Sequence, residues 1–453
     1  MPTPPAPSDP SRPSSPPPAT AVPAEAVPLH GEAYKRDPAE LYRELRERGP
    51  VHRVAFPSGV HAWLVTGYEA AHRTLNDERL GKNHALGNDA WRARASIMPE
   101  PQHSQLQVHL LHQDPPRHTA MRRLITDAFA PRRVAELHPR IQAIADELLD
   151  AALERAGSRT DAEGAARLDL VADFAAHFPF RVLAEVIGLA SEPARRFDRD
   201  WGKVVQPVGP TDPGRPLYEG RLRGLQSYID EVTASQRTHP SEALLGRLVA
   251  AQEAGALTKE ELDSIVFQLL VAGQEPVTNQ ITTSVLALLR HPDQLDRLRE
   301  DPGLLPRAVE ELLRYDAAFE LTTWRFFAED SDLYGTRIPA GDSVIVSLWA
   351  ANRDPDRFPE PDALDLGRAP QQHLAFGHGI HFCPGASLAR VELQVALGTL
   401  LRRLPGLRAD FGAEEPRWIR AVLARGVDAL PVAFRPGAGG AAPAGGCPVH
   451  RLG

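Results

Sequence analysis

The sequence predicts a mainly α-helical fold, with one large helical domain that carries small β-sheets. Apolar residues recur at spacings of three and four along much of the chain, most clearly between Val134 and Leu189, as in amphipathic helices. Stretches with the β-branched and aromatic residues of strands are short and few. Neither an internal repeat nor a long linker divides the middle of the chain, so we expect residues 29–435 to form one domain.

The composition is that of a water-soluble globular protein. Of the 453 residues, 42% are hydrophobic and 24% are charged, and the formal net charge of -8 argues against a nucleic-acid partner. No stretch has the roughly 18 apolar residues of a membrane span, and the N-terminus lacks a basic region followed by an apolar core. Two cysteines are too few for a disulfide framework. We therefore expect a cytoplasmic protein without a membrane anchor.

Both ends of the chain differ from its middle. Residues 1–28 contain eleven prolines, and this composition buries too little apolar surface to fold, so we expect a disordered Pro-rich extension. Residues 436–453 are rich in Gly and Ala and are expected to form a flexible tail. Cys447 lies there in a Cys-x-x-His pattern, but one half-site is too little for a metal centre.

Four short runs are predicted as strands. Runs 51–56 and 61–67 flank the turn Pro-Ser-Gly-Val, which predicts a β-hairpin. Runs 321–330 and 342–348 lie on either side of the turn Ile-Pro-Ala-Gly. Most of the remaining pattern is helical.

A long apolar helix is predicted in the second half of the chain. Thr258 and Glu261 have the spacing of a capping box, which starts a helix. The apolar pattern continues to Leu289, which gives about 32 residues and roughly 48 Å at 1.5 Å per residue. Pro276 lies in the middle of this helix, where a proline costs about 3 kcal/mol. Either the helix tolerates a local kink there or the proline has a part in the chemistry.

A glycine-rich loop with one cysteine precedes another predicted helix, which begins near Ala386. A cysteine just before a helix start meets free backbone N–H groups and the positive end of the helix dipole, which favour the thiolate. Gly377, Gly379 and Gly385 allow tight turns and a close approach to a flat ligand. The loop is therefore suited to presenting the Cys383 sulfur as an anion.

The pattern Phe376-Gly377-x-Gly379-x-His381-x-Cys383-x-Gly385 resembles the haem-ligand loop of the cytochrome P-450 superfamily. The resemblance implies heme b with the Cys383 thiolate as axial ligand of the iron, and contacts from the loop residues. A thiolate ligand pushes electron density onto the iron and favours O–O cleavage. It also implies the fold of that superfamily, in which the haem lies between the long central helix and the cysteine-loop helix.

Other motifs resemble the same superfamily. Glu311 and Arg314 match its Glu-x-x-Arg pair, three residues apart on one helix face, and Arg368 matches the third member of that structural triad. Four further residues match contacts to the haem propionates, for which guanidinium and imidazole donors are suited: His118, Arg122, Arg325 and His381.

The proline of the central helix lies where relatives usually have Ala-Gly-x-(Asp/Glu)-Thr, with the acid and the threonine implicated in proton delivery. This chain keeps Gly273 and Glu275 but has Pro276 in place of the threonine. Thr278 is two residues on and points elsewhere, whereas Gln280 shares the face but lies farther along. Our hypothesis is that a hydroxyl of the substrate assists proton delivery beside Glu275.

The resemblance implies a soluble bacterial monooxygenase that hydroxylates or epoxidises a small hydrophobic molecule, such as a polyketide or macrolide secondary metabolite. Electrons would come from NAD(P)H through a ferredoxin and its reductase, and the protein is expected to be a monomer. Basic residues near the cysteine side are candidates for ferredoxin docking: Arg123, Arg132, Arg133 and Arg390. Expected substrate contacts are Leu86, Val271, Leu321 and Thr322.

Two alternatives remain open on the sequence. One is a haem-thiolate enzyme that uses peroxide or couples phenols, because Pro276 alters the usual acid-threonine pair. The other is a catalytically degenerate helper protein. Retention of Cys383, Glu311 and Arg314 argues against the helper, because such relatives commonly lose the thiolate or the Glu-x-x-Arg pair.

Overall fold

The computed structural model describes residues 26–29, 31–95, 105–157, 164–189, 191–197, 199–205, 212–412 and 415–435. The C-terminal tail with Cys447, and the predicted N-terminal extension apart from residues 26–28, lie outside these ranges. Within the described part, no helix is long and apolar enough to cross a membrane.

Helices make up most of the fold, as predicted. They are α1 (Glu32–Arg36), α2 (Ala39–Arg48), α3 (Tyr68–Leu75), α4 (Asp89–Ala95), α6 (Arg117–Thr126), α7 (Pro131–Gly157), α8 (Phe178–Ile187), α9 (Ser191–Arg196), α10 (Arg215–Thr238), α11 (Leu244–Glu253), α12 (Lys259–Ala272), α13 (Glu275–Arg290), α14 (Pro292–Glu300), α15 (Leu305–Tyr315), α16 (Leu348–Asn352) and α17 (Ala386–Arg403). The largest buried apolar cluster lies among the long helices, where α17 packs against α7, α13 and α15.

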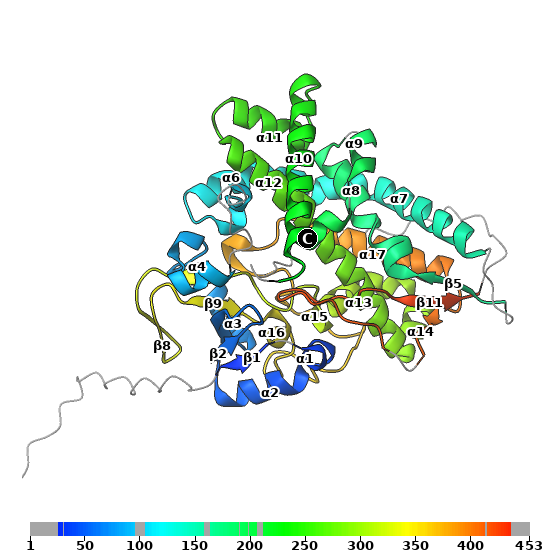
Figure 1. Cartoon of the computed structure of the whole chain (residues 1–453). Coiled ribbons are helices and arrows are strands. Elements are labelled where there is room, and N and C mark those ends of the chain that lie inside the picture. Colours follow the sequence, from blue (N-terminus) through cyan, green and yellow to red (C-terminus); the bar gives the residue numbers. More distant parts are fainter. Residues whose placement is uncertain are drawn as a thin grey trace, which may run out of the picture.

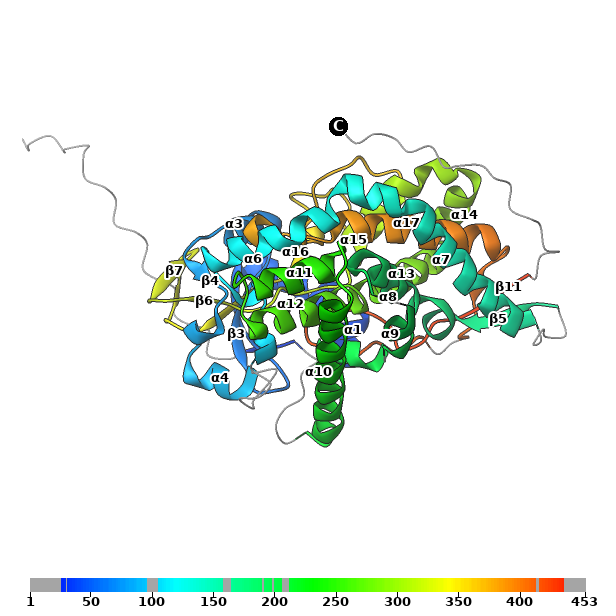
Figure 2. The same ribbon diagram turned by 90° about the horizontal axis from the view of Figure 1, so that it is seen from above.

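The strands form three small sheets. They are β1 (Val27–Pro28), β2 (Val51–Ala55), β3 (His61–Val65), β4 (Leu80–Gly81), β5 (Ala166–Asp169), β6 (Arg325–Phe327), β7 (Ser331–Leu333), β8 (Thr336–Ile338), β9 (Ser343–Val346), β10 (Arg408–Ala409) and β11 (Pro431–Phe434). The six-stranded sheet has the order β1-β2-β3-β9-β6-β4 and lies at one end of the molecule, while the β10-β11-β5 sheet lies at the other (Figures 1 and 2).

The predicted hairpin is confirmed, because β2 and β3 pair antiparallel. The predicted late strands correspond to β6 and β9, which also pair antiparallel. Between them lies the β7–β8 hairpin, which the sequence analysis did not predict. Its loop is Tyr334–Gly335, and both residues have the positive φ angles of a two-residue hairpin turn.

The Pro-rich extension ends earlier than predicted. Val27 and Pro28 form β1, which pairs parallel with Val54 and Ala55 of β2. A proline is tolerated there because β1 is an edge strand.

The predicted long helix is interrupted, which corrects the expectation of about 32 continuous residues. The capping box of Thr258 and Glu261 starts α12 as predicted, but α12 ends at Ala272 and α13 begins at Glu275. Pro276 is therefore in the first turn of α13, where the missing N–H has no helical partner to lose. The physical reason for the break is the same proline, whose ring clashes with the carbonyl four residues earlier in a continuous helix.

Candidate active site

One face of α12 and α13 is accessible, although the other faces are largely buried. Between positions 262 and 271 every residue is buried except Gln268, which is half-buried. Ala272 is exposed, and Glu275 and Pro276 are half-buried. Gly273 and Gln274 keep near-helical backbone angles, so these four positions, separated by four, three and one residues, share one face.

Gly273 allows the central helix to approach α8 closely. A Cβ atom at this position would lie 2.8 Å from the Leu269 carbonyl oxygen and 3.0 Å from a methyl carbon of Leu183. A side chain at this position would therefore require the Leu183 side chain or the local backbone to shift beside Glu275.

The two polar residues that follow Pro276 have structural partners. Thr278 Oγ1 donates to the Ala175 carbonyl at 2.9 Å, so it points away from the accessible face, as expected. The Gln280 amide accepts from Ala318 N–H at 2.9 Å and donates to the Asp316 carbonyl at 3.2 Å. Gln280 therefore ties α13 to the segment that follows α15.

The cysteine loop is held by backbone bonds and by two glycines. The Cys383 N–H donates to the Phe376 carbonyl at 3.0 Å. Gly377 and Gly379 have φ angles of +71° and +73°, a conformation that other residues rarely adopt. Within the described chain, no heavy atom lies within 4 Å of a Cβ built on Gly377, so this loop borders open space. Gly385 precedes α17, which begins at Ala386 as predicted.

Burial raises the pKa of the Cys383 thiol, whereas the Gly385 N–H, Arg122 and Arg390 lower it. Burial has the larger effect on the thiol pKa, so the N–H group at the helix start does not by itself produce a thiolate. The thiolate therefore needs a further positive charge, and a metal ion that takes the sulfur as a ligand supplies one.

The predicted propionate contacts come together beside this loop. The rings of His118 and His381 are 4.4 Å apart. Among the described residues, both ring nitrogens of each histidine and Nη1 of Arg122 are buried without a hydrogen-bond partner. Burial lowers the pKa of His381 to about 2, helped by Lys82 and His118. Unpaired buried donors of this kind indicate a ligand with acceptor oxygens.

Lys82 and Arg325 add two buried cations, of which Lys82 was missed in the sequence analysis. They are 1% and 5% exposed. In the part of the chain that the structure describes, neither forms an ion pair with a carboxylate. Lys82 Nζ donates to the Thr323 hydroxyl, and Asp114 accepts from the Lys82 backbone N–H at 2.8 Å. Haem b has two propionates, and this set of donors fits two carboxylates.

A row of aromatic rings extends from this site to α12. His84 and His112 have ring centroids 3.8 Å apart, and those of His112 and His109 are 4.3 Å apart. His109 in turn stacks on Phe267 of α12. Burial lowers the pKa of both His84 and His109 to about 3, helped by Lys82, so these histidines are neutral at pH 7.

The triad predicted from the sequence is brought together in the structure. The Arg314 guanidinium donates to both oxygens of Glu311 at 2.7 and 2.8 Å, and Arg368 Nε donates to Glu311 at 3.1 Å. Arg314 also donates to three backbone carbonyls of residues 352–363. This buried cluster fixes α15 to the segment that leads to the cysteine loop.

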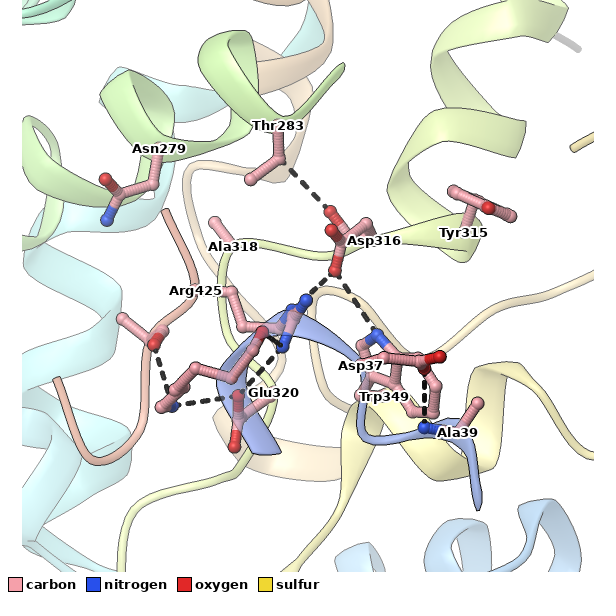
Figure 3. Close-up of polar contacts among 12 residues, drawn as sticks. Asp37, Ala39, Asn279, Thr283, Tyr315, Asp316, Ala318, Glu320, Trp349 and Arg425 are labelled. Atoms are coloured by element: carbon pink, nitrogen blue, oxygen red, sulfur yellow. Dashed lines mark hydrogen bonds and ion pairs between the residues drawn. The ribbon is translucent and has the colours of Figure 1, made fainter. Parts of the chain in front are cut away.

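A second buried polar cluster lies beside α13 (Figure 3). Arg425 Nε donates to Asp316 at 2.6 Å, and Lys35 Nζ donates to Glu320 at 2.9 Å. The Thr283 hydroxyl of α13 donates to the Asp316 carbonyl at 3.4 Å. No local sequence pattern predicts this cluster, because its members are up to 390 residues apart.

The four expected substrate contacts lie in different surroundings. Leu86 packs against the buried cluster that contains Leu321. The Thr322 hydroxyl accepts from Val346 N–H at 3.1 Å. Val271 belongs instead to the larger helical cluster. Leu86 and Leu321 therefore belong to one apolar cluster, whereas Val271, which is buried, belongs to another.

A helical fold with a cysteine at a helix start, beside a cradle of unpaired cations and imidazoles, is suited to a thiolate-ligated haem protein. Comparison with known proteins agrees. Residues 303–406 match the Cytochrome P450 family model. The chain is 41% identical to the cytochrome P450 monooxygenase PikC of Streptomyces venezuelae, over 90% of this chain and 93% of that protein.

Two further relatives are similar along nearly their whole length. The mycinamicin IV hydroxylase/epoxidase of Micromonospora griseorubida is 40% identical, over 87% of this chain and 95% of that protein. A crystal structure of a myxobacterial cytochrome P450 in complex with myristic acid has a TM-score of 0.83 and 38% identity, over 90% of this chain and 98% of that one.

The chain belongs to the cytochrome P450 family. It is a monooxygenase with a thiolate-ligated haem cofactor, which takes electrons from redox partners.

Proposed function

We propose that this enzyme hydroxylates or epoxidises a small hydrophobic secondary metabolite, such as a polyketide or macrolide. One observation carries the proposal: buried donors of His118, His381 and Arg122 lie unpaired, within the described residues, beside the loop of Cys383. Such donors are costly to bury without acceptors, so a cofactor with carboxylates is needed to complete the fold. The relative named for hydroxylation and epoxidation of mycinamicin IV supports the reaction type.

The residues proposed to hold the haem have separate tasks. Cys383 would be the axial ligand, and the bound haem supplies oxygen activation favoured by its thiolate. Phe376, Gly377, Gly379 and Gly385 shape the loop around the sulfur. The propionates would be held by His118, Arg122, Arg325 and His381, to which we add Lys82.

The accessible face of the central helices is proposed to deliver protons. The Glu275 carboxyl would hold the proton, and a substrate hydroxyl would replace the hydroxyl that Pro276 lacks. Gly273 permits the close helix approach that places Glu275 on this face. Thr278 and Gln280 are held by structural bonds, which supports a proton route that does not use them.

A ferredoxin is the proposed electron donor. Ile380 and Phe382 of the cysteine loop are 55% and 39% exposed, and the side chains of Arg132 and Arg133 are 83% and 50% exposed. Exposed apolar residues and exposed arginines are groups that an acidic partner would contact. Arg390 is removed from the expected docking set, because it pairs with Glu310 at 2.7 Å and covers the Phe376 ring.

A peroxide-driven enzyme is the second candidate, and Pro276 is the observation that favours it. The two can be separated by comparing turnover with NAD(P)H, surrogate ferredoxin and reductase against turnover with peroxide alone. We expect product only from the complete redox chain, and a reduced carbon-monoxide spectrum of the thiolate type. Equal or faster product formation with peroxide would favour the second candidate. A histidine-type spectrum would contradict both enzyme candidates and favour the catalytically degenerate helper protein.

A further inference from the structure

We infer that the substrate carries a hydroxyl group that hydrogen-bonds to the side-chain amide of Gln268, and that Gln268 selects substrates by this group. The inference rests on the proposed function, because it takes the accessible face of α12 and α13 as the border of the reaction site.

The first observation is an unpaired oxygen. Gln268 Oε1 is buried and has no hydrogen-bond partner among the residues that the structure describes. Buried polar atoms in native proteins nearly always have a partner, and exceptions commonly mark the place of a ligand or a water molecule. On an apolar helix, between Phe267 and Leu269, a buried amide oxygen without a partner costs free energy that an apolar side chain would not.

The second observation is the position of Gln268. It begins the accessible face that continues through Ala272 to Glu275 and Pro276. Ala272 lies four residues further along α12, which is about 6 Å at 1.5 Å per residue. The positions of the family's acid and missing hydroxyl, Glu275 and Pro276, lie seven and eight residues beyond Gln268, about 10–12 Å or two helical turns along the same face.

The third observation concerns a segment that packs against α12 close to Gln268. Helix η2 (Gln105–Gln107) packs against α12, and the adjacent Val108 N–H donates to Ser264 Oγ at 3.2 Å. Ser264 is four residues before Gln268 on α12, so this segment lies one turn away. Gln268 therefore lies next to this segment on the same side of α12.

A hydroxyl is the group that suits this site. An amide offers one acceptor oxygen and an NH₂ donor, and a hydroxyl can donate to the first or accept from the second. A substrate ammonium or carboxylate would be buried here beside a neutral amide alone, without the charged partner it requires. The substrate thus has a hydrophobic body and a hydroxyl remote from the carbon that is oxidised, by a distance on the order of one to two helical turns, about 6–12 Å.

The test uses ligands that bind through the haem iron of the holoenzyme. Alkyl imidazoles with butyl, hexyl and octyl chains are titrated and followed by the red shift of the haem absorption band. Each is compared with the same molecule that carries a terminal hydroxyl. The ratio of the two Kd values reports how well the pocket accepts the hydroxyl at that distance.

In the wild-type enzyme we expect one of the three chain lengths to bind as tightly with the hydroxyl as without it, or more tightly. Gln268→Met should weaken only the hydroxylated ligand of that length, by roughly three- to tenfold, the effect of one hydrogen bond. Gln274→Met is the matched control, because Gln274 also has an unpaired Oε1 but is buried off the accessible face.

Each failure has its own meaning. If imidazoles bind but Gln268→Met changes no Kd ratio at any chain length, the inference is wrong and the proposed function stands. If Gln274→Met has the same effect as Gln268→Met, the effect is on the helix and the inference is also wrong. If no ligand shifts the spectrum of the haem-loaded protein, the proposed function itself fails.

Discussion

Lys82 and Arg325 are buried cations beside the imidazoles of His118 and His381. Burial lowers the pKa of Lys82 well below its ordinary value, and lowers that of Arg325 to about 10. A buried charge is tolerated only with a charged partner, so both cations indicate the place where cofactor carboxylates bind.

Lys82→Met should loosen the haem. Because methionine keeps the length of the side chain but removes its charge, we expect the haem to transfer to apomyoglobin roughly tenfold faster, the effect of about 1.4 kcal/mol. Lys203→Met, at an exposed lysine, is the control and should change nothing. Equal transfer rates for all three proteins would remove Lys82 from the propionate set.

Glu311→Ala should be strongly destabilising. It leaves Arg314, which is 2% exposed, without its carboxylate, and breaking a buried ion pair costs about 3–5 kcal/mol. Glu44→Ala removes an exposed pair with Arg48 and should cost less than about 1 kcal/mol. Urea unfolding of the two variants measures the difference. A cost for Glu311→Ala as small as that for Glu44→Ala would contradict the structural role of the triad.

At the scale of elements, the helix starts were easier to predict than the helix break. The capping box of Thr258 and the start of α17 depend on residues within one turn of each other. The interruption depends on the single residue Pro276, and the apolar pattern continues across it. The cluster of Asp316, Glu320 and Arg425 is formed by segments far apart in sequence, which no local pattern reports.

Because the central helix is interrupted just before Pro276, we predict that this proline has little effect on the free energy of unfolding. Pro276→Ala should change the free energy of unfolding by less than about 1 kcal/mol, because the residue lies in the first turn of α13. Ala287→Pro, inside the same helix, should cost about 3 kcal/mol or more. Thermal unfolding of both holoenzymes measures this. A large loss from Pro276→Ala would mean that the proline itself maintains the fold.

Pro276→Thr tests the chemistry at the same position. If a substrate hydroxyl assists proton delivery, an added threonine disturbs that arrangement, and we expect a lower fraction of NAD(P)H to be converted into product with the true substrate. Uncoupled NAD(P)H consumption and product are measured together. Unchanged or improved coupling would count against the substrate-assisted route.

At the scale of the whole molecule, the neutral histidines in the row of rings from His84 through His112 and His109 to Phe267 predict a loss of stability in mild acid. Burial lowers the pKa of His84 and His109 to about 3 from an ordinary 6.5. Their stabilising contribution is therefore complete above pH 6.5 and is lost as the pH falls toward 3, because the unfolded chain takes up protons that the folded chain does not. The slope is at most about 1.4 kcal/mol per pH unit for each histidine.

The measurement is the free energy of unfolding of the holoenzyme between pH 7 and 5. His109→Gln should give a shallower decline than the wild type, because one titrating group is removed. His239→Gln, outside the ring row, should follow the wild-type curve. Parallel curves for all three proteins would show that the acid sensitivity has another origin.

The Lys35–Glu320–Arg425 cluster has a consequence for the order in which the protein can fold. The Lys35 carbonyl accepts from Arg425, 390 residues later in the chain. At roughly 5–20 residues per second on the ribosome, Arg425 is synthesised about 20–80 seconds after Lys35. Until then Glu320 lacks its Arg425 partner, and the N–H groups of Glu320 and Leu321 lack the Leu423 carbonyl to which they donate. The nascent chain is therefore expected to fix the segment around Glu320 and Leu321 last, after most of its long helices have formed.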